Sequence, residues 1–119
     1  MSSSGKVRAS HILVKHEGSR RPASHRDGEG VTIKATSRDA AVLILQAFRD
    51  AIVAGKVDFQ IIAARYSDCS SAKRSGDLGW FSRGQMQKPF EDATYALDVG
   101  EMSDIVDTDS GVHIILRTG

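Results

Sequence analysis

The sequence predicts an α+β domain, a small sheet with helices around it. Three observations predict this class: an alternating apolar segment near the amino end, two stretches of helical apolar spacing in the middle, and two strand-like segments around a glycine turn at the carboxyl end. Strands and helices segregated in this way are typical of α+β domains. At 119 residues the chain is expected to form a single domain over residues 1–119, with residues 1–5 flexible.

The first predicted strand runs from Val7 to Lys15. Alternation along a strand puts His11 and Lys15 on the same face. Residues 16–36 follow, with three glycines, several charges and almost no periodic apolar pattern, so we expect a long basic loop there. Loops of this length in compact domains are usually functional or disordered.

Two helices are predicted next. Thr36 and Asp39 have the spacing of a capping box, and the helix they open ends at Gly55. Asp58 is the predicted N-cap of the second helix, which ends just before Cys69. The apolar stripes of these helices are Ala41, Ile44, Leu45, Phe48 and Ile52 in the first, and Phe59, Ile62, Ala63 and Tyr66 in the second.

The last third predicts a turn over residues 70–75, a strand from Leu78 to Ser82, and a helix that opens at Pro89. Two closing strands, over residues 103–108 and 112–118, flank Asp109-Ser110-Gly111, a hairpin signal in which glycine supplies the left-handed position. The residues alone therefore predict the order β-α-α-turn-β-α-β-β.

Charge argues against a general nucleic-acid or membrane binder, because sixteen basic and fifteen acidic residues give a net charge of +1. The charge is unevenly distributed, with +5 over residues 1–26 and −4 over residues 27–119. The longest apolar run, residues 40–45, is far too short to cross a bilayer.

Cysteine usage and the amino end indicate the compartment. Cys69 has no partner for an internal disulfide, and the first residues lack the apolar core of a signal peptide. A reducing compartment, the cytoplasm or the nucleus or both, is therefore expected. The chain shows no glycine-rich nucleotide loop and no metal-ligand spacing, so neither a cofactor nor a metal is expected.

Residues 67–96, SDCSSAKRSGDLGWFSRGQMQKPFEDATYA, hold one thiol and an apolar trio, Leu78, Met86 and Phe90. These three can converge on a pocket that suits a small ring such as proline if the backbone turns sharply at the glycines between them, Gly76, Gly79 and Gly84. Isolated leucine and phenylalanine are usually ordinary core. Met86 favours a pocket because its neighbours, GQMQKP, are too polar for a core segment.

Together with ASHILVKH at 9–16, Arg20 and Arg21, and TDSGVHIILRT at 108–118, this segment resembles the parvulin family of peptidyl-prolyl isomerases. More narrowly, it resembles the branch that acts on phosphoserine-proline and phosphothreonine-proline bonds. The resemblance implies a four-stranded antiparallel sheet surrounded by helices, of the FKBP-like superfold, in the order β-α-α-α-β-α-β-β. It also implies one catalytic domain without an N-terminal WW domain, proline-directed phosphoproteins as substrates, and a monomer.

The resemblance assigns the proline pocket to Leu78, Met86 and Phe90, with Gln87 at the rim. It assigns a phosphate clamp to Lys15, Arg20 and Arg21, two planar donors and one point charge. Most arginine pairs are solvated surface, which is the alternative here.

The remaining site residues are His11, His113, Cys69, Thr108 and Ser110. The resemblance places the two histidines face to face beneath the reacting amide, near the other three. A histidine pair can hold a hydrogen-bond network that sets the polarity of Cys69, without proton transfer. Cys69 itself could be an inert core thiol, a nucleophile or an electrostatic group; parvulins elsewhere can carry aspartate there, which favours the electrostatic role.

Three rival functions stay open from the sequence. One is a thiol hydrolase built from Cys69, either His11 or His113, and Asp77. Another is a binding module for phosphorylated Ser/Thr-Pro segments that does not catalyse. The last is a parvulin that is indifferent to phosphate.

Overall fold

The computed structural model describes residues 5–119, so the expectation of flexibility for residues 1–5 lies, apart from Gly5, outside the described residues. In chain order the elements are β1 (Val7–Val14), α1 (Val31–Lys34), α2 (Arg38–Val53), α3 (Phe59–Tyr66), the 3₁₀ turn η1 (Ser70–Arg74), β2 (Asp77–Phe81), α4 (Lys88–Ala96), β3 (Val106–Thr108) and β4 (Gly111–Arg117). The order β-α-α-α-β-α-β-β that the resemblance implied is confirmed, whereas the order predicted from the residues alone lacks α1.

The four strands form one antiparallel sheet in the order β2-β1-β4-β3, which confirms the predicted α+β class. The first and last strands of the chain are thus its two central strands. They pair without interruption from Ala9 opposite Arg117 to Val14 opposite Val112.

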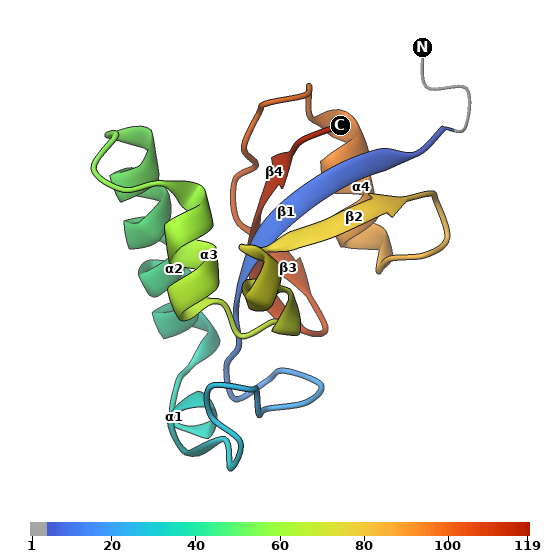
Figure 1. The fold of residues 1–119 in the computed structure, drawn as a ribbon. Coiled ribbons are helices and arrows are strands. Elements are labelled where there is room, and N and C mark those ends of the chain that lie inside the picture. The colour runs from blue at the N-terminus through green and yellow to red at the C-terminus, as the bar shows by residue number, and fades with distance from the viewer. Residues whose placement is uncertain (1–4) are drawn as a thin grey trace.

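The helices cover both faces of the sheet: α2 and α3 lie on one side and α4 on the other (Figure 1). Successive side chains of a strand point to opposite faces, so β1 contributes to two cores. Ile12 and Val14 pack with Leu45 of α2 in one core. Val7 and Ala9 pack with Phe90 of α4 in the other.

The predicted capping box is wrong by one residue. Ser37, not Thr36, is the N-cap of α2, and its Oγ accepts a hydrogen bond of 3.0 Å from the Ala40 N–H. The Thr36 hydroxyl donates a hydrogen bond of 2.7 Å to the Thr32 carbonyl of α1 instead of capping α2. Asp58 occupies the N-cap position of α3 as predicted, although its side chain makes no capping hydrogen bond.

The strand predicted over residues 103–108 is shorter in the structure, because β3 begins at Val106. The Ser103 hydroxyl explains the difference. Its Oγ accepts a hydrogen bond of 2.9 Å from the Ile115 N–H. In a regular ladder a backbone carbonyl would accept this bond, so the strand pairing is interrupted at Ser103. Beyond it, Met102 and Leu116 form an isolated bridge.

Residues 16–36, predicted to be a loop, contain the four-residue helix α1. Asp27 holds its start by accepting hydrogen bonds from the N–H groups of Val31, Thr32 and Ile33 at 2.9 to 3.0 Å. These bonds, with that from Ile33 the strongest cause, lower the pKa of Asp27. Within residues 5–119 we find no helix that combines the length and apolar character needed to cross a membrane.

We expect Leu45→Ala to lower the free energy of unfolding by about 2–5 kcal/mol, since Leu45 is fully buried and truncation leaves a cavity. Leu43 lies on the same helix with 72% of its surface exposed, and Leu43→Ala should change stability by less than about 0.5 kcal/mol. Urea unfolding of the two variants checks this. Equal effects would contradict the assignment of the inner face of α2.

Candidate active site

Two histidines meet on the sheet face that α4 covers. His11 of β1 lies opposite Ile115 and His113 of β4 lies opposite Leu13, so the two are diagonal neighbours on one face. Their Nδ1 atoms are 3.0 Å apart and their rings are stacked. Phe90 of α4 places its ring edge-on to both, with centroids 5.3 and 5.2 Å away. The predicted face-to-face pair is therefore present.

A chain of hydrogen bonds leads from this pair to the protein surface. His113 Nε2 lies 2.7 Å from Thr108 Oγ1, which also accepts from the Ser110 N–H at 3.1 Å. Gln87 then joins α4 to the hairpin, because its Nε2 donates to Ser110 Oγ at 2.7 Å and its Oε1 accepts from the Asp109 N–H at 3.1 Å. The closing hairpin and the proposed pocket rim are thus one network.

Burial keeps both histidines neutral. It lowers the pKa of His11 to about 4; burial, followed by the repulsion that a protonated His11 would exert, lowers the pKa of His113 to about 3. A short contact between two Nδ1 atoms requires one N–H and one lone pair, which two neutral rings provide. The pair can therefore orient polar groups at neutral pH without carrying charge.

The three apolar residues predicted to form a pocket belong to one hydrophobic cluster. Leu78 of β2 and Met86 of the β2–α4 loop are half-buried and pack against the core cluster that contains Phe90. Gly76, with φ of +89°, lets the backbone just before β2 lie close to β1, because a Cβ there would lie 2.5 Å from the His11 carbonyl oxygen. Gln87 lies beside them at the start of α4.

A hollow of about 450 Å³ is lined both by residues of the basic loop and by the thiol. Lys15, Arg21, Cys69 and Ser110 all line it. Cys69 is a half-exposed free thiol at this wall. Arg20 does not line the hollow; its backbone N–H donates to the Asp109 carbonyl at 2.7 Å and ties the loop to the hairpin.

Lys15 connects the end of β1 to the loop. Its Nζ donates to the carbonyls of Arg21 and Ala23 at 3.0 and 2.7 Å. Burial, followed by the charge of Arg21, lowers the pKa of Lys15, while Asp68 and Cys69 act in the opposite direction. The ammonium thus shapes the loop as well as adding charge to the hollow.

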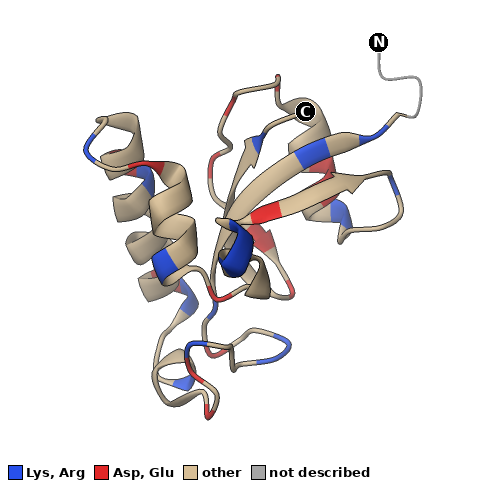
Figure 2. Cartoon of the chain, in the orientation of Figure 1, with Lys and Arg blue, Asp and Glu red and all other residues tan. Residues whose placement is uncertain are grey.

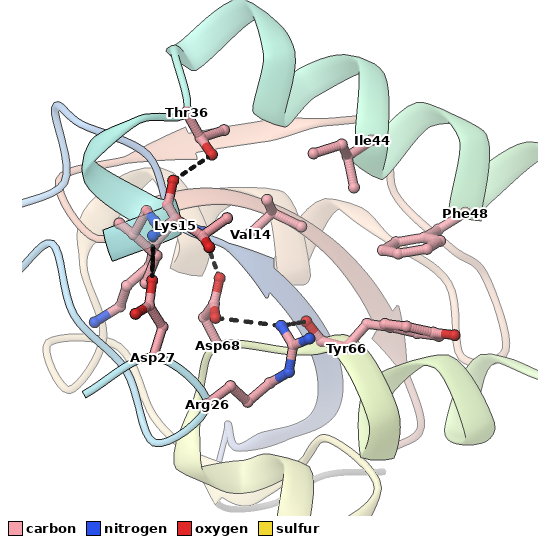
Figure 3. A pocket seen from close by; sticks show the side chains of 11 residues that line it. Val14, Lys15, Arg26, Asp27, Thr36, Ile44, Phe48, Tyr66 and Asp68 are labelled. Carbon is pink, nitrogen blue, oxygen red and sulfur yellow. Dashed lines mark hydrogen bonds and ion pairs between the residues drawn. The ribbon is translucent and has the colours of Figure 1, made fainter. Parts of the chain in front are cut away.

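Asp68 is one residue of this region that the sequence did not indicate. It is buried, and its Oδ2 accepts from the Lys15 N–H at 2.9 Å while its Oδ1 accepts from the Ser24 hydroxyl at 2.9 Å and lies 3.5 Å from Arg26. Figure 3 shows it between β1, the loop and the end of α3, beside a hollow of about 260 Å³. The available signal was a carboxylate directly after a helix and next to the single cysteine.

In the part of the chain that the structure describes, histidine, cysteine and carboxylate side chains form no group of three or more that could hold a metal ion. The site is instead an apolar cluster that contains Leu78, Met86 and Phe90, together with a hollow lined by Lys15, Arg21 and the carboxylate of Asp68. The hydrogen bond between Gln87 and Ser110 connects the two regions. Such an arrangement can hold a ring and an anion side by side.

Comparison with known proteins identifies the family to which the chain belongs. Residues 11–119 match the family described as Rotamase, PPIC-type PPIASE domain. The chain is 70% identical over 118 residues to peptidyl-prolyl cis-trans isomerase Pin1 of Malus domestica, covering 99% of this chain and 98% of that protein. The Pin1 of Arabidopsis thaliana is 66% identical over 118 residues, covering 99% of each protein.

Solved structures of similar fold support the same family. The peptidyl-prolyl isomerase ESS1 from Candida albicans superposes with a TM-score of 0.94 at 46% identity, over 100% of this chain and 66% of that one. The solution structure of TbPIN1 superposes with a TM-score of 0.87 at 47% identity, over 98% and 99%.

Fold, site and comparisons define an enzyme class, the peptidyl-prolyl cis/trans isomerases. More narrowly, the chain belongs to the parvulin family, as the resemblance in its sequence implied.

Stability should depend on pH through the histidine pair. Between about pH 6.5 and pH 4 the unfolded chain takes up protons on His11 and His113 while the folded chain keeps both neutral, so the free energy of unfolding falls as the pH drops. The contribution of the pair should level off near pH 3. Urea unfolding from pH 7 to 3 checks this, and His113→Gln should reduce the slope by up to about 1.4 kcal/mol per pH unit. An unchanged slope would contradict neutral burial.

Proposed function

We propose that this isomerase acts on phosphoserine-proline and phosphothreonine-proline bonds, and that it accelerates their rotation without a covalent intermediate. One observation carries the proposal: Lys15 and Arg21 line a hollow with Cys69 and Ser110, and the Ser110 hydroxyl accepts a hydrogen bond of 2.7 Å from Gln87, the residue after Met86. A phosphate and the proline that follows it would occupy neighbouring sites.

The arginines of the loop support a phosphate clamp. Within residues 5–119, Arg20 and Arg21 form no ion pair with a carboxylate, and both are exposed. Figure 2 shows basic residues on the loop that follows β1. A phosphate carries about −1.5 to −2 charges and accepts bidentate hydrogen bonds from guanidinium groups. Two arginines without carboxylate partners are thus suited to bind it.

Rotation about the prolyl bond needs no bond to form or break. The barrier of about 18–20 kcal/mol comes from amide resonance, and each 1.36 kcal/mol or so of preferential binding to the twisted amide gives a tenfold rate gain. The proposed pocket would hold the ring while the clamp holds the preceding residue. Cys69 would act as a polar group near the carbonyl, and the neutral histidines would orient its surroundings.

The proposal includes the setting of the enzyme. We propose that its substrates are proline-directed phosphoproteins, that it works as a monomer, and that it acts in the cytoplasm, the nucleus or both. The single free thiol is compatible with such reducing compartments.

Replacing both Arg20 and Arg21 by alanine should lower kcat/KM on a phosphoserine-proline peptide by about 10²–10⁴, since two charge-assisted contacts are lost. Activity on the unphosphorylated peptide should change by less than about threefold. Exchange NMR at the prolyl bond measures both peptides with catalytic amounts of protein.

The matched control replaces Lys34 and Arg65, two exposed basic residues of α1 and α3, which changes the net charge equally. It should leave both rates near those of the wild type. An unchanged ratio between phosphorylated and unphosphorylated peptide in the Arg20 and Arg21 variant would instead identify a phosphate-indifferent parvulin.

Cys69→Asp should retain kcat/KM within about tenfold of the wild type, because an anionic side chain preserves a polar group beside the carbonyl. No covalent adduct with substrate should appear in mass spectra of the wild type during turnover. Complete loss of turnover in Cys69→Asp together with a wild-type adduct would favour a nucleophilic thiol.

A further inference from the structure

The loop between β2 and α4, residues 82–87, carries two of the proposed site residues, Met86 and Gln87. Arg83, Gly84 and Gln85 in this loop are exposed, so burial of apolar side chains does not hold its middle. Surface loops without such burial are generally mobile unless polar contacts tie them down. Packing of Met86 against the cluster that contains Phe90 therefore holds only one end of the loop, and the position of its middle depends on other contacts.

Glu91, in the first turn of α4, provides these contacts. Only 6% of its surface is exposed. Its Oε1 accepts a hydrogen bond of 2.5 Å from the Gly84 N–H, and its Oε2 lies 3.0 Å from the Arg83 guanidinium. Each oxygen of a buried carboxylate is thus engaged by the same loop, as a buried charge requires.

The partners of Glu91 are themselves constrained. Gly84 has φ of +91°, a backbone conformation that residues with a side chain rarely adopt. The Arg83 guanidinium lies over the Tyr95 ring, 4.3 Å from its centroid, and 3.1 Å from Asp92. Charge and backbone shape therefore select one arrangement of the loop around Glu91.

Met86 lies between two fixed points. Gly84 is held by Glu91 on one side, and Gln87 is held on the other by its bonds to Ser110 and Asp109. Glu91 also follows Phe90 directly in α4, so one helical turn sets both the aromatic part of the pocket and the loop that carries the methionine.

We propose that Glu91 is a positioning residue, which fixes the Met86 side of the pocket and thereby sets the ring size that the enzyme accepts. The inference rests on the proposed proline pocket. Glu91 touches no substrate in this proposal; it acts through Gly84, Arg83 and the loop.

The test compares Glu91→Ala with Asp92→Asn. Asp92 is the matched control because it also pairs with Arg83 but is exposed and does not contact Gly84. Three phosphopeptides carry proline, its four-membered-ring analogue or its six-membered-ring analogue at the same position. Exchange NMR gives kcat and KM for each peptide.

In Glu91→Ala we expect kcat/KM on the proline peptide to fall by about tenfold or more, chiefly through KM, and the preference for proline over the six-membered ring to fall by at least about threefold. Asp92→Asn should stay within about twofold on all three peptides. The Met86 methyl resonance of the free protein should shift in Glu91→Ala and remain in place in Asp92→Asn.

A merely structural role would lower the amount of folded enzyme and reduce the rates on all three peptides equally. An unchanged ring preference in folded Glu91→Ala, or an equal change in Asp92→Asn, would therefore overturn the proposal. If Glu91→Ala does not fold, Glu91→Gln carries the same test. It keeps an acceptor for Gly84 but loses the charge that holds Arg83, so a smaller change of the same ratio is expected and an unchanged ratio overturns the proposal.

Met86→Ala separates this inference from the proposed pocket. If Met86→Ala leaves the ring preference unchanged, the pocket assignment fails. If Met86→Ala alters the preference but the Glu91 variants do not, the pocket stands and only the role of Glu91 is overturned.

Discussion

The pairing of β1 with β4 is the constraint on which the rest of the structure depends. These two strands come from opposite ends of the chain and form the centre of the sheet, with six consecutive residue pairs. Because the side-chain period of a strand is two, a shift of one residue in this pairing would place His11 and His113 on opposite faces of the sheet. The register therefore decides both which residues fill the two cores and whether the histidine pair exists.

Two buried carboxylates fix the positions of two loops, as the hydrogen-bond ladder fixes the positions of the strands. Asp68 holds the basic loop to β1, and Glu91 holds the β2–α4 loop to α4. Both side chains are buried. In each of them, both carboxylate oxygens contact hydrogen-bond or ion-pair partners that are distant in sequence or lie across a turn. Removing a partner from such a group leaves a buried charge without compensation, so these contacts restrict each loop to one arrangement.

The site combines a neutral interior with a basic rim. Burial keeps His11 and His113 uncharged, while Arg20 and Arg21 are exposed and Arg21 lines the hollow together with Cys69. This separation suits rotation of an amide, in which no proton needs to move, next to the binding of an anion, which needs charge at the surface. The hydrogen bonds through Thr108, Ser110 and Gln87 make the two regions one network.

The sequence by itself determined the class of fold, the position of nearly every helix and strand, and the grouping of Leu78, Met86 and Phe90 in one cluster, because apolar periodicity and glycine turns are local signals. It misplaced the cap of α2 by one residue and the start of β3 by three, since competing hydroxyl contacts of Thr36 and Ser103 decide those positions. Only the tertiary structure revealed Asp68 and Glu91 as supports of the two loops. Their partners are set by packing between segments that are distant in sequence or joined by an irregular loop, and no periodic pattern records such contacts.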